Sequence, residues 1–256
     1  MSYLGTNRGR ARLNLDGVSK PVPVYLAENA NAVLLCHFNE ANNSTTLVDA
    51  TGRHTLTCVD GAKASSGKSK FFSTSLYLDG TADLVSVAGN VSDFAFGNGQ
   101  FTLETWLWLD DATVGTTRAI MGKGGVTADW STSTGISWIW YYNNSSDKLA
   151  FTYNSAGSPV ALASAVIGSR GRWNHFAAVQ TASTFKMYHN GTEVYSGGVI
   201  TITNPTTSDR VYIGDNSVGS DEPFKGYLQE LRVLKGEGFY TADFSESLPT
   251  APFRPL

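Results

Sequence analysis

Adjacent acidic residues occur at two places in the chain, Asp110-Asp111 and Asp221-Glu222. Hydrolysis of a glycosidic bond needs two carboxyl groups about 5–9.5 Å apart that face the same bond. Neighbouring side chains of an extended chain point to opposite sides, so neither pair is suited to this acid–base chemistry. We interpret both pairs as solvated loop charges.

Other catalytic arrangements are also missing from the sequence. The four histidines fit no His-x-x-His or His-Glu-x-x-His metal-binding spacing, and no Gly-x-Ser-x-Gly nucleophile motif occurs. The sequence therefore predicts a protein that is not an enzyme.

Aromatic residues are concentrated in one part of the chain and offer a different chemistry, the stacking of sugars. Five fall within thirteen positions: Trp130, Trp138, Trp140, Tyr141 and Tyr142. The three tryptophans are candidate glycan-binding residues, and Trp130 is the best placed for exposure because it lies in a Gly/Ser/Thr-rich segment, 122–135. Trp138 and Trp140 would share a strand face with Ile136, so they could instead belong to the core.

The first thirty residues have the character of an extended arm. Arg8, Arg10 and Arg12 alternate and would lie on one side of an extended chain, while Pro21 and Pro23 restrict the backbone that follows. Guanidinium groups suit carboxylates at interfaces. We expect the three arginines to bind a protein partner; a disordered leader or an edge strand of the domain itself is the alternative.

The composition is that of an ordered globular protein, because 12% of the 256 residues are aromatic and only 16% are charged. A net charge of −3 argues against nucleic acid as a partner. No apolar run approaches the ~20 residues of a membrane span, and we expect no secretory signal. Cys36 and Cys58 are interpreted as small buried hydrophobes, with a disulfide as the alternative.

Short apolar segments that end in Gly- or Asn-rich turns predict an all-β, two-sheet antiparallel sandwich over residues 31–256. Residues 101–109 are apolar on both faces and should form a central strand. Residues 75–87 predict a hairpin across Asp79 to Thr81. A second hairpin is predicted at 184–195, where Asn190-Gly191 suits a tight turn.

The most informative stretch is 224–234, which reads FKGYLQELRVL. Strand alternation predicts two apolar faces, one with Leu228 and Leu234 and the other with Tyr227, Leu231 and Val233. Such a strand is covered on both sides, so Leu228 and Trp106 should be buried. A buried Glu230 needs a partner, and Arg232 is the nearest candidate.

This stretch resembles the F-x-G-x-I-x-E signature, followed by an arginine, of laminin-G-like, concanavalin A-like jelly rolls. Four further family-like segments occur in the expected order: Leu34–Glu40, Ser75–Gly80, Phe101–Leu109 and Trp173–Val194. The resemblance covers about residues 31 to 253. It implies a jelly roll preceded by the arm at residues 1–30.

Relatives in this family often carry a Ca²⁺ ion near the first and the closing strands. Asn39 and Gln229 stand where aspartates are common, and the loss of two negative charges should weaken such a site. Asp79 and Asp83 are the remaining candidate ligands, although Asp79 also suits a turn. We expect no cofactor, with Ca²⁺ as the alternative.

Residues 238–253 resemble the R-Y-T-x-x-F…P-P-T-x-P-F segments that close such domains in structural proteins of tailed phages. Phe239 replaces the basic residue here, and Leu248-Pro249 replaces the two prolines. The resemblance implies a non-enzymatic virion protein on the particle exterior, a capsid decoration (cement) protein or a tail or fibre component. We expect a homo-oligomer that binds other virion proteins through the arm. The alternatives are a carbohydrate-binding, receptor-binding module and a glucanase-like hydrolase.

Overall fold

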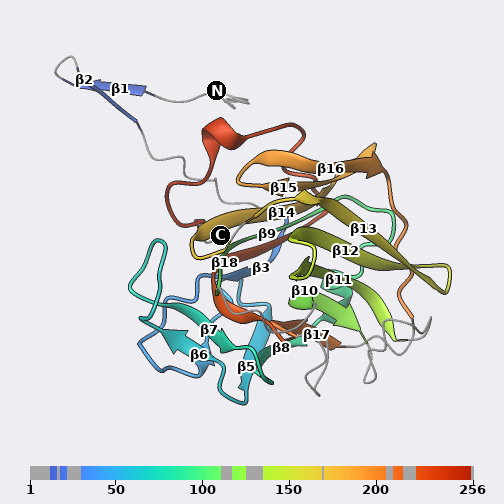
Figure 1. Ribbon diagram of the computed structural model, residues 1–256, viewed down its shortest axis with the longest axis horizontal. Coiled ribbons are helices and arrows are strands. Elements are labelled where there is room, and N and C mark those ends of the chain that lie inside the picture. Colours follow the sequence, from blue (N-terminus) through green and yellow to red (C-terminus); the bar gives the residue numbers. More distant parts are fainter. Residues whose placement is uncertain are drawn as a thin grey trace.

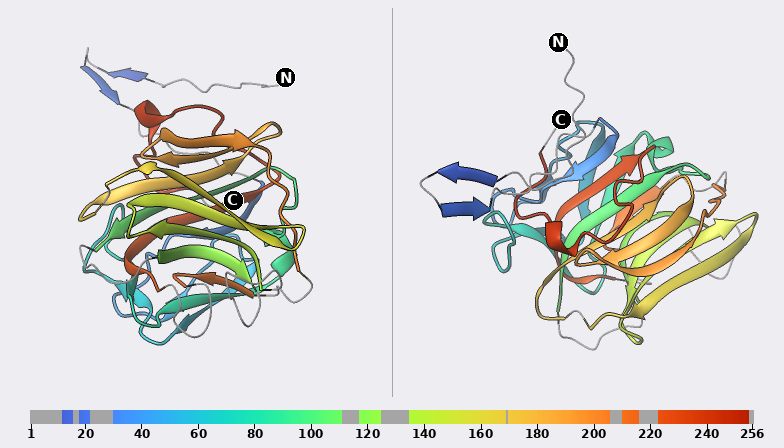
Figure 2. Two further views of the ribbon diagram at one scale, coloured as in Figure 1. Left: turned by 45° about the vertical axis from the view of Figure 1, so that its right-hand side comes forward. Right: turned by 90° about the horizontal axis from the view of Figure 1, so that it is seen from above.

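The computed structural model describes residues 30–110, 117–124, 135–168, 170–205, 210–215 and 223–254, and the backbone of 12–15 and 18–21. Two eight-stranded antiparallel sheets pack face to face (Figure 1). This arrangement confirms the predicted all-β sandwich. Two further views show the same two layers (Figure 2).

The first sheet, called sheet I, has the strand order β13-β12-β11-β10-β17-β8-β5-β4. Its strands, in chain order, are β4 (Thr46–Leu47), β5 (His54–Val59), β8 (Leu84–Gly89), β10 (Thr117–Gly124), β11 (Ile136–Asn143), β12 (Lys148–Ser155), β13 (Ser158–Val166) and β17 (Arg210–Ile213). A single-turn 3₁₀ helix, η1 (Val91–Phe94), follows β8.

The second sheet, called sheet II, has the order β16-β15-β14-β9-β18-β7-β6, and β3 also pairs with β18. Its strands are β3 (Ala32–Cys36), β6 (Lys63–Ser65), β7 (Ser75–Asp79), β9 (Phe101–Leu109), β14 (Trp173–Gln180), β15 (Thr184–His189), β16 (Thr192–Gly198) and β18 (Lys225–Lys235). The chain then continues through η2 (Ser245–Ser247).

Strand β18 lies in the middle of sheet II and pairs with β9 on one side and with β7 and then β3 on the other. Gln229 lies opposite Trp106 and Arg232 opposite Glu104, so β18 contains one residue more than β9 in this interval. Glu230 has a φ of 57° at this bulge. The extra residue reverses the alternation of side chains.

The predicted faces of β18 are therefore wrong beyond the bulge. Leu228, Leu231 and Val233 all point into the core between the sheets, whereas Tyr227 lies on the outer face. Leu228 is fully buried and Trp106 is 4% exposed, as predicted.

The hairpin predicted for residues 75–87 is also wrong, because β7 belongs to sheet II and β8 to sheet I. The chain crosses between the sheets at this corner. The hairpin predicted for 184–195 is confirmed by β15 and β16, with φ values of 49° at Asn190 and 78° at Gly191.

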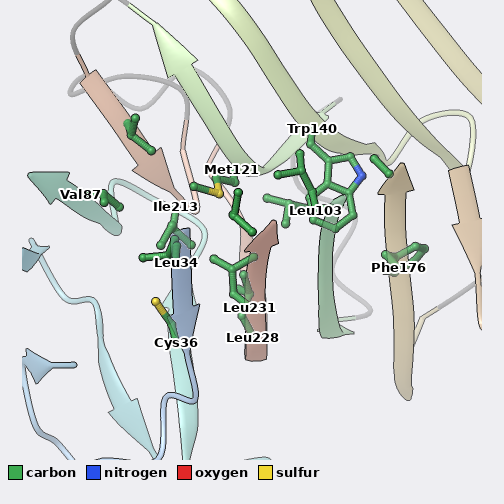
Figure 3. Packing of buried hydrophobic residues seen from close by; sticks show 14 of the residues in the cluster. Leu34, Cys36, Val87, Leu103, Met121, Trp140, Phe176, Ile213, Leu228 and Leu231 are labelled. Atoms are coloured by element: carbon green, nitrogen blue, oxygen red, sulfur yellow. The ribbon is translucent and has the colours of Figure 1, made fainter. Parts of the chain in front are cut away.

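The core is filled by apolar side chains from both sheets (Figure 3). Leu34, Leu228 and Leu231 of sheet II lie against Met121, Trp140 and Ile213 of sheet I. Cys36 is buried here, Cys58 is partly buried, and both are free thiols, which excludes the disulfide.

Candidate functional site

Two of the three tryptophans predicted to bind glycan lie in the core. Trp138 and Trp140 are both 0% exposed on the inner face of β11. Trp138 stacks on Phe151 with ring centroids 6.0 Å apart. Neither ring can stack on a sugar, because core side chains already cover it. Trp130 lies outside the described residues.

The two candidate calcium ligands act as hydrogen-bond acceptors for the backbone. Asp83 is buried and accepts hydrogen bonds from the amides of Gly61 (2.6 Å) and Asp79 (2.9 Å). Burial raises the pKa of Asp83, and these two hydrogen bonds oppose the rise. Asp79 accepts from the amide and hydroxyl of Thr81. Within the described residues, no three His, Cys, Asp or Glu side chains are grouped to hold a metal ion.

Other predicted residues fall where the side chains are not described. Arg8 and Arg10 lie outside the described residues, and Arg12 begins β1 (Arg12–Leu15), of which only the backbone is described. Asp111 and the Asp221-Glu222 pair are also outside, so their interpretation as loop charges stays a prediction.

Three of the cross-strand rows of side chains on the outer face of sheet II bear on the candidate site, and two of these three are covered. The first covered row contains Glu104 and Arg232, which lie opposite each other on β9 and β18. The Arg232 Nε donates to Glu104 Oε1 at 2.8 Å. The C-terminal segment covers this row: the Tyr240 hydroxyl donates to Glu104 Oε2 at 2.6 Å, and the Phe253 ring lies 4.3 Å from the Arg232 guanidinium.

The partner predicted for Glu230 is wrong. Arg232 pairs with Glu104, because the bulge moves Glu230 away from Arg232. Glu230 Oε1 instead lies 2.7 Å from His37 Nδ1, within hydrogen-bond distance. Glu230 Oε2 accepts a hydrogen bond from the backbone amide of Phe253 at 2.6 Å. Both carboxylates are fully buried, so neither is accessible to a substrate.

The second covered row contains Trp106 and Gln229, and the loop between β6 and β7 lies over it. Gln229 Oε1 accepts hydrogen bonds from the backbone amides of Lys70 and Phe71, both at 2.8 Å. The Phe71 ring meets Trp106 edge to face at 5.8 Å. Gln229, considered above only as a weakened metal ligand, therefore fixes this loop on the sheet.

The third row is open. It consists of Tyr77 on β7, Tyr227 on β18, Trp108 on β9 and Trp173 on β14, and we call it the aromatic row. Each residue lies directly opposite the next in the strand pairing. All four are partly exposed, whereas their neighbours Leu76, Leu107 and Leu228 point into the core.

The rings of the aromatic row do not lie in one plane. Tyr77 and Tyr227 are tilted by 42° with centroids 5.0 Å apart. Trp108 and Trp173 meet at 71° and 6.1 Å. Four adjacent strands place the rings along about 15 Å. This surface suits one extended ligand chain better than a flat solid surface.

The row combines apolar ring faces with hydrogen-bonding groups. The pKa of Tyr77 is raised by burial and by the carboxylates of Asp79 and Asp110. The pKa of Tyr227 is raised by burial, by Tyr77 and by Asp110. Both phenols therefore stay protonated and can donate hydrogen bonds at neutral pH. Partly exposed aromatic residues that are contiguous on a surface mark interaction sites. Sugars offer the matching chemistry, with apolar C–H faces and hydroxyl edges.

The two-sheet architecture defines the class of β-sandwich jelly rolls. The chain belongs to the concanavalin A-like lectin/glucanases superfamily, whose model matches residues 79–237. This confirms the resemblance seen in the sequence. No curated protein matches the chain. None of the helices in the described residues is long and apolar enough to span a membrane.

Solved structures with the same fold include toxin binding domains. The receptor-binding domain of the botulinum neurotoxin C/D mosaic serotype has a TM-score of 0.60 and 13% identity, over 84% of this chain and 50% of that one. Botulinum neurotoxin type C, whose cell entry is dependent upon interaction with two ganglioside molecules, gives 0.59 and 13%, over 84% and 50%. The binding domain of Paraclostridial Mosquitocidal Protein 1 gives 0.58 and 13%, over 80% and 49%.

The chain therefore spans about half the length of these structures. They are binding domains of toxins, not phage proteins and not glucanases. The phage assignment made from the C-terminal segment stays a prediction, and these comparisons do not show glucanase activity.

Proposed function

We propose that the chain is a carbohydrate-binding, lectin-like module whose ligand stacks on the aromatic row. The observation that carries this proposal is the row itself, in which four partly exposed aromatic residues are adjacent across four strands. Membership of a superfamily that includes lectins supports it. The toxin neighbours add the fold alone, because only half of each matches and the identities are low.

The test is a broad glycan array followed by titration of the tightest ligand. Replacing Trp108 or Trp173 with Ala should weaken that ligand by about 2 kcal/mol, or roughly thirtyfold in Kd, as for an aromatic residue at the centre of an interface. Tyr141→Ala is the matched control, because Tyr141 is a partly exposed aromatic on sheet I. It should leave the Kd unchanged.

Thermal unfolding of each variant checks that the fold is intact. An array without any bound glycan, or a ligand whose Kd is the same for wild type and both tryptophan variants, contradicts the proposal.

We further propose that the N-terminal arm attaches the module to a larger assembly. Strands β1 and β2 (Val18–Pro21) form a two-stranded sheet that pairs with no described strand of the sandwich and lies apart from it (Figures 1 and 2). A two-stranded ribbon by itself is only marginally stable in water, so a partner surface would stabilise it. A virion is the assembly that the C-terminal segment suggests.

Deleting residues 1–28 should leave the midpoint of thermal unfolding nearly unchanged and abolish incorporation into particles. Incorporation is measured by counting copies per purified particle against a particle protein of known number. A large drop in the midpoint would show that the arm belongs to the sandwich, and normal copy number without the arm would place attachment elsewhere.

A further inference from the structure

Three lysines border one side of the aromatic row. Lys63 on β6 lies directly opposite Tyr77. The ammonium groups of Lys68 and Lys70, in the loop that follows β6, lie 4.8 Å from the ring centre of Trp108 and 4.1 Å from that of Trp106. None of the ion pairs between described residues includes any of the three lysines. The ammonium groups of Lys68 and Lys70, which lie over these two rings, are therefore available to pair with an acidic ligand.

The backbone of this loop is fixed beside the row. Ser75 donates a hydrogen bond to the Lys68 carbonyl at 2.6 Å, and Gln229 binds the next turn of the loop. A Cβ added at Gly67 would collide with the hydroxyl of Tyr227, so this position has no room for a larger residue. The side chain of Lys68 is exposed, so it can reach a ligand on the row while its backbone stays in place.

A ligand that stacks on Trp108 has to displace the Lys68 ammonium or bind to it, because this group lies over the ring face. A neutral sugar would have to displace the cation and lose its attraction to the ring. A sugar with an acidic group would instead accept a charge-assisted hydrogen bond from the ammonium. The exchange then frees the ring face and keeps the charge paired, so an acidic ligand has the advantage.

The acidic residues near the row, Asp79 and Asp110, lie next to Lys225, two residues before Tyr227 on β18. Asp79 lies opposite Lys225 in the strand pairing, and the amide of Asp110 donates to the Lys225 carbonyl. Negative charge on the ligand is therefore disfavoured near the start of β18, where Asp79 and Asp110 lie, and favoured beside the loop that carries Lys68.

We infer that the ligand of the aromatic row is an acidic glycan, a sugar chain whose carboxylate or sulfate group binds Lys68 while a sugar ring stacks on Trp108. This inference rests on the proposed carbohydrate-binding function. It adds the chemical class of the ligand and the residue that selects it.

The test compares three oligosaccharides by calorimetric titration at low and high salt: hexagalacturonate, its methyl ester, and a sulfated heparin-derived hexasaccharide. The wild type should bind at least one acidic oligosaccharide about tenfold more tightly than the neutral ester, and added NaCl should reduce this preference. Lys68→Gln should remove the preference. Lys148→Gln, which makes the same charge change on sheet I, should leave it intact.

Preference for the sulfated hexasaccharide alone would identify sulfate as the acidic group and support the inference. Equal affinity for all three oligosaccharides, binding of none of the three, or an unchanged preference in Lys68→Gln would overturn it. The proposed function is judged separately with Trp108→Ala. If a neutral glycan binds and this variant abolishes its binding, the function stands and only the acidic preference falls.

Discussion

Replacing Arg232 with Met is expected to lower the free energy of unfolding by about 3–5 kcal/mol, because it leaves a buried carboxylate without its counter-ion. Glu104 and Arg232 are almost completely buried under the C-terminal segment. Met keeps the apolar stem of the side chain and removes the charge. Denaturation with urea at pH 7 measures the change.

Arg170→Met is the matched control. Arg170 pairs with Asp147 at 2.9 Å, but both side chains are partly exposed, at 23% and 36%. An exposed pair contributes about 0–1 kcal/mol. If Arg232→Met costs no more than Arg170→Met, the Glu104–Arg232 pair does not hold the C-terminal segment on the sheet.

The pH dependence of the same variant gives an independent check. Burial raises the pKa of Glu104, but Arg232 and the hydrogen bonds from His175 and Tyr240 outweigh it and lower the pKa to about 2. An unfolded Glu has a pKa of about 4.3. The folded value is the lower one, so this group stabilises the protein above pH about 4.3 and loses that effect as the pH falls towards 2. The stability difference between wild type and Arg232→Met should shrink over this range.

Leu228→Ala is expected to cost about 2–5 kcal/mol, through lost apolar burial and the cavity it leaves. Leu228 is 0% exposed in the centre of β18 and lies in the core between the sheets. The comparison is Val166→Ala, where the side chain is 66% exposed and the change should stay within about 0.5 kcal/mol. A similar loss of stability for the two variants would contradict the central place of β18.

The sequence predicted the sandwich and its central strands because their apolar patterns are local. It did not reveal the bulge at Glu230, since no side-chain pattern marks one extra residue in a strand. The prediction of a hairpin at 75–87 was wrong because the sequence of the turn at Asp79 is the same whether the chain stays in one sheet or crosses to the other. The last three residues of β10, 122–124, fall within the Gly/Ser/Thr-rich segment 122–135, where glycines and a lysine hide a buried strand.

The prediction of Trp138 and Trp140 as glycan-binding residues failed, and the aromatic row was not predicted at all, for related reasons. Trp138 and Trp140 alternate along one strand, a pattern shared by a binding surface and a core face, and the packing of the two sheets decides for the core. The aromatic row comes from four segments that are distant in the sequence, each of which contributes one outward aromatic residue to it. Only the strand register brings them together, and no single segment carries that information.

Carbohydrate binding by the aromatic row is tested most directly by the response of the six tryptophan indole N–H signals to glycan in a ¹H–¹⁵N NMR titration. Trp→Phe variants assign the signals. We expect the signals of Trp108 and Trp173 to shift in proportion to ligand bound, and those of the buried Trp138 and Trp140 to stay in place. A glycan that binds the protein and shifts only Trp130, or no indole, would contradict the aromatic row as the carbohydrate-binding site.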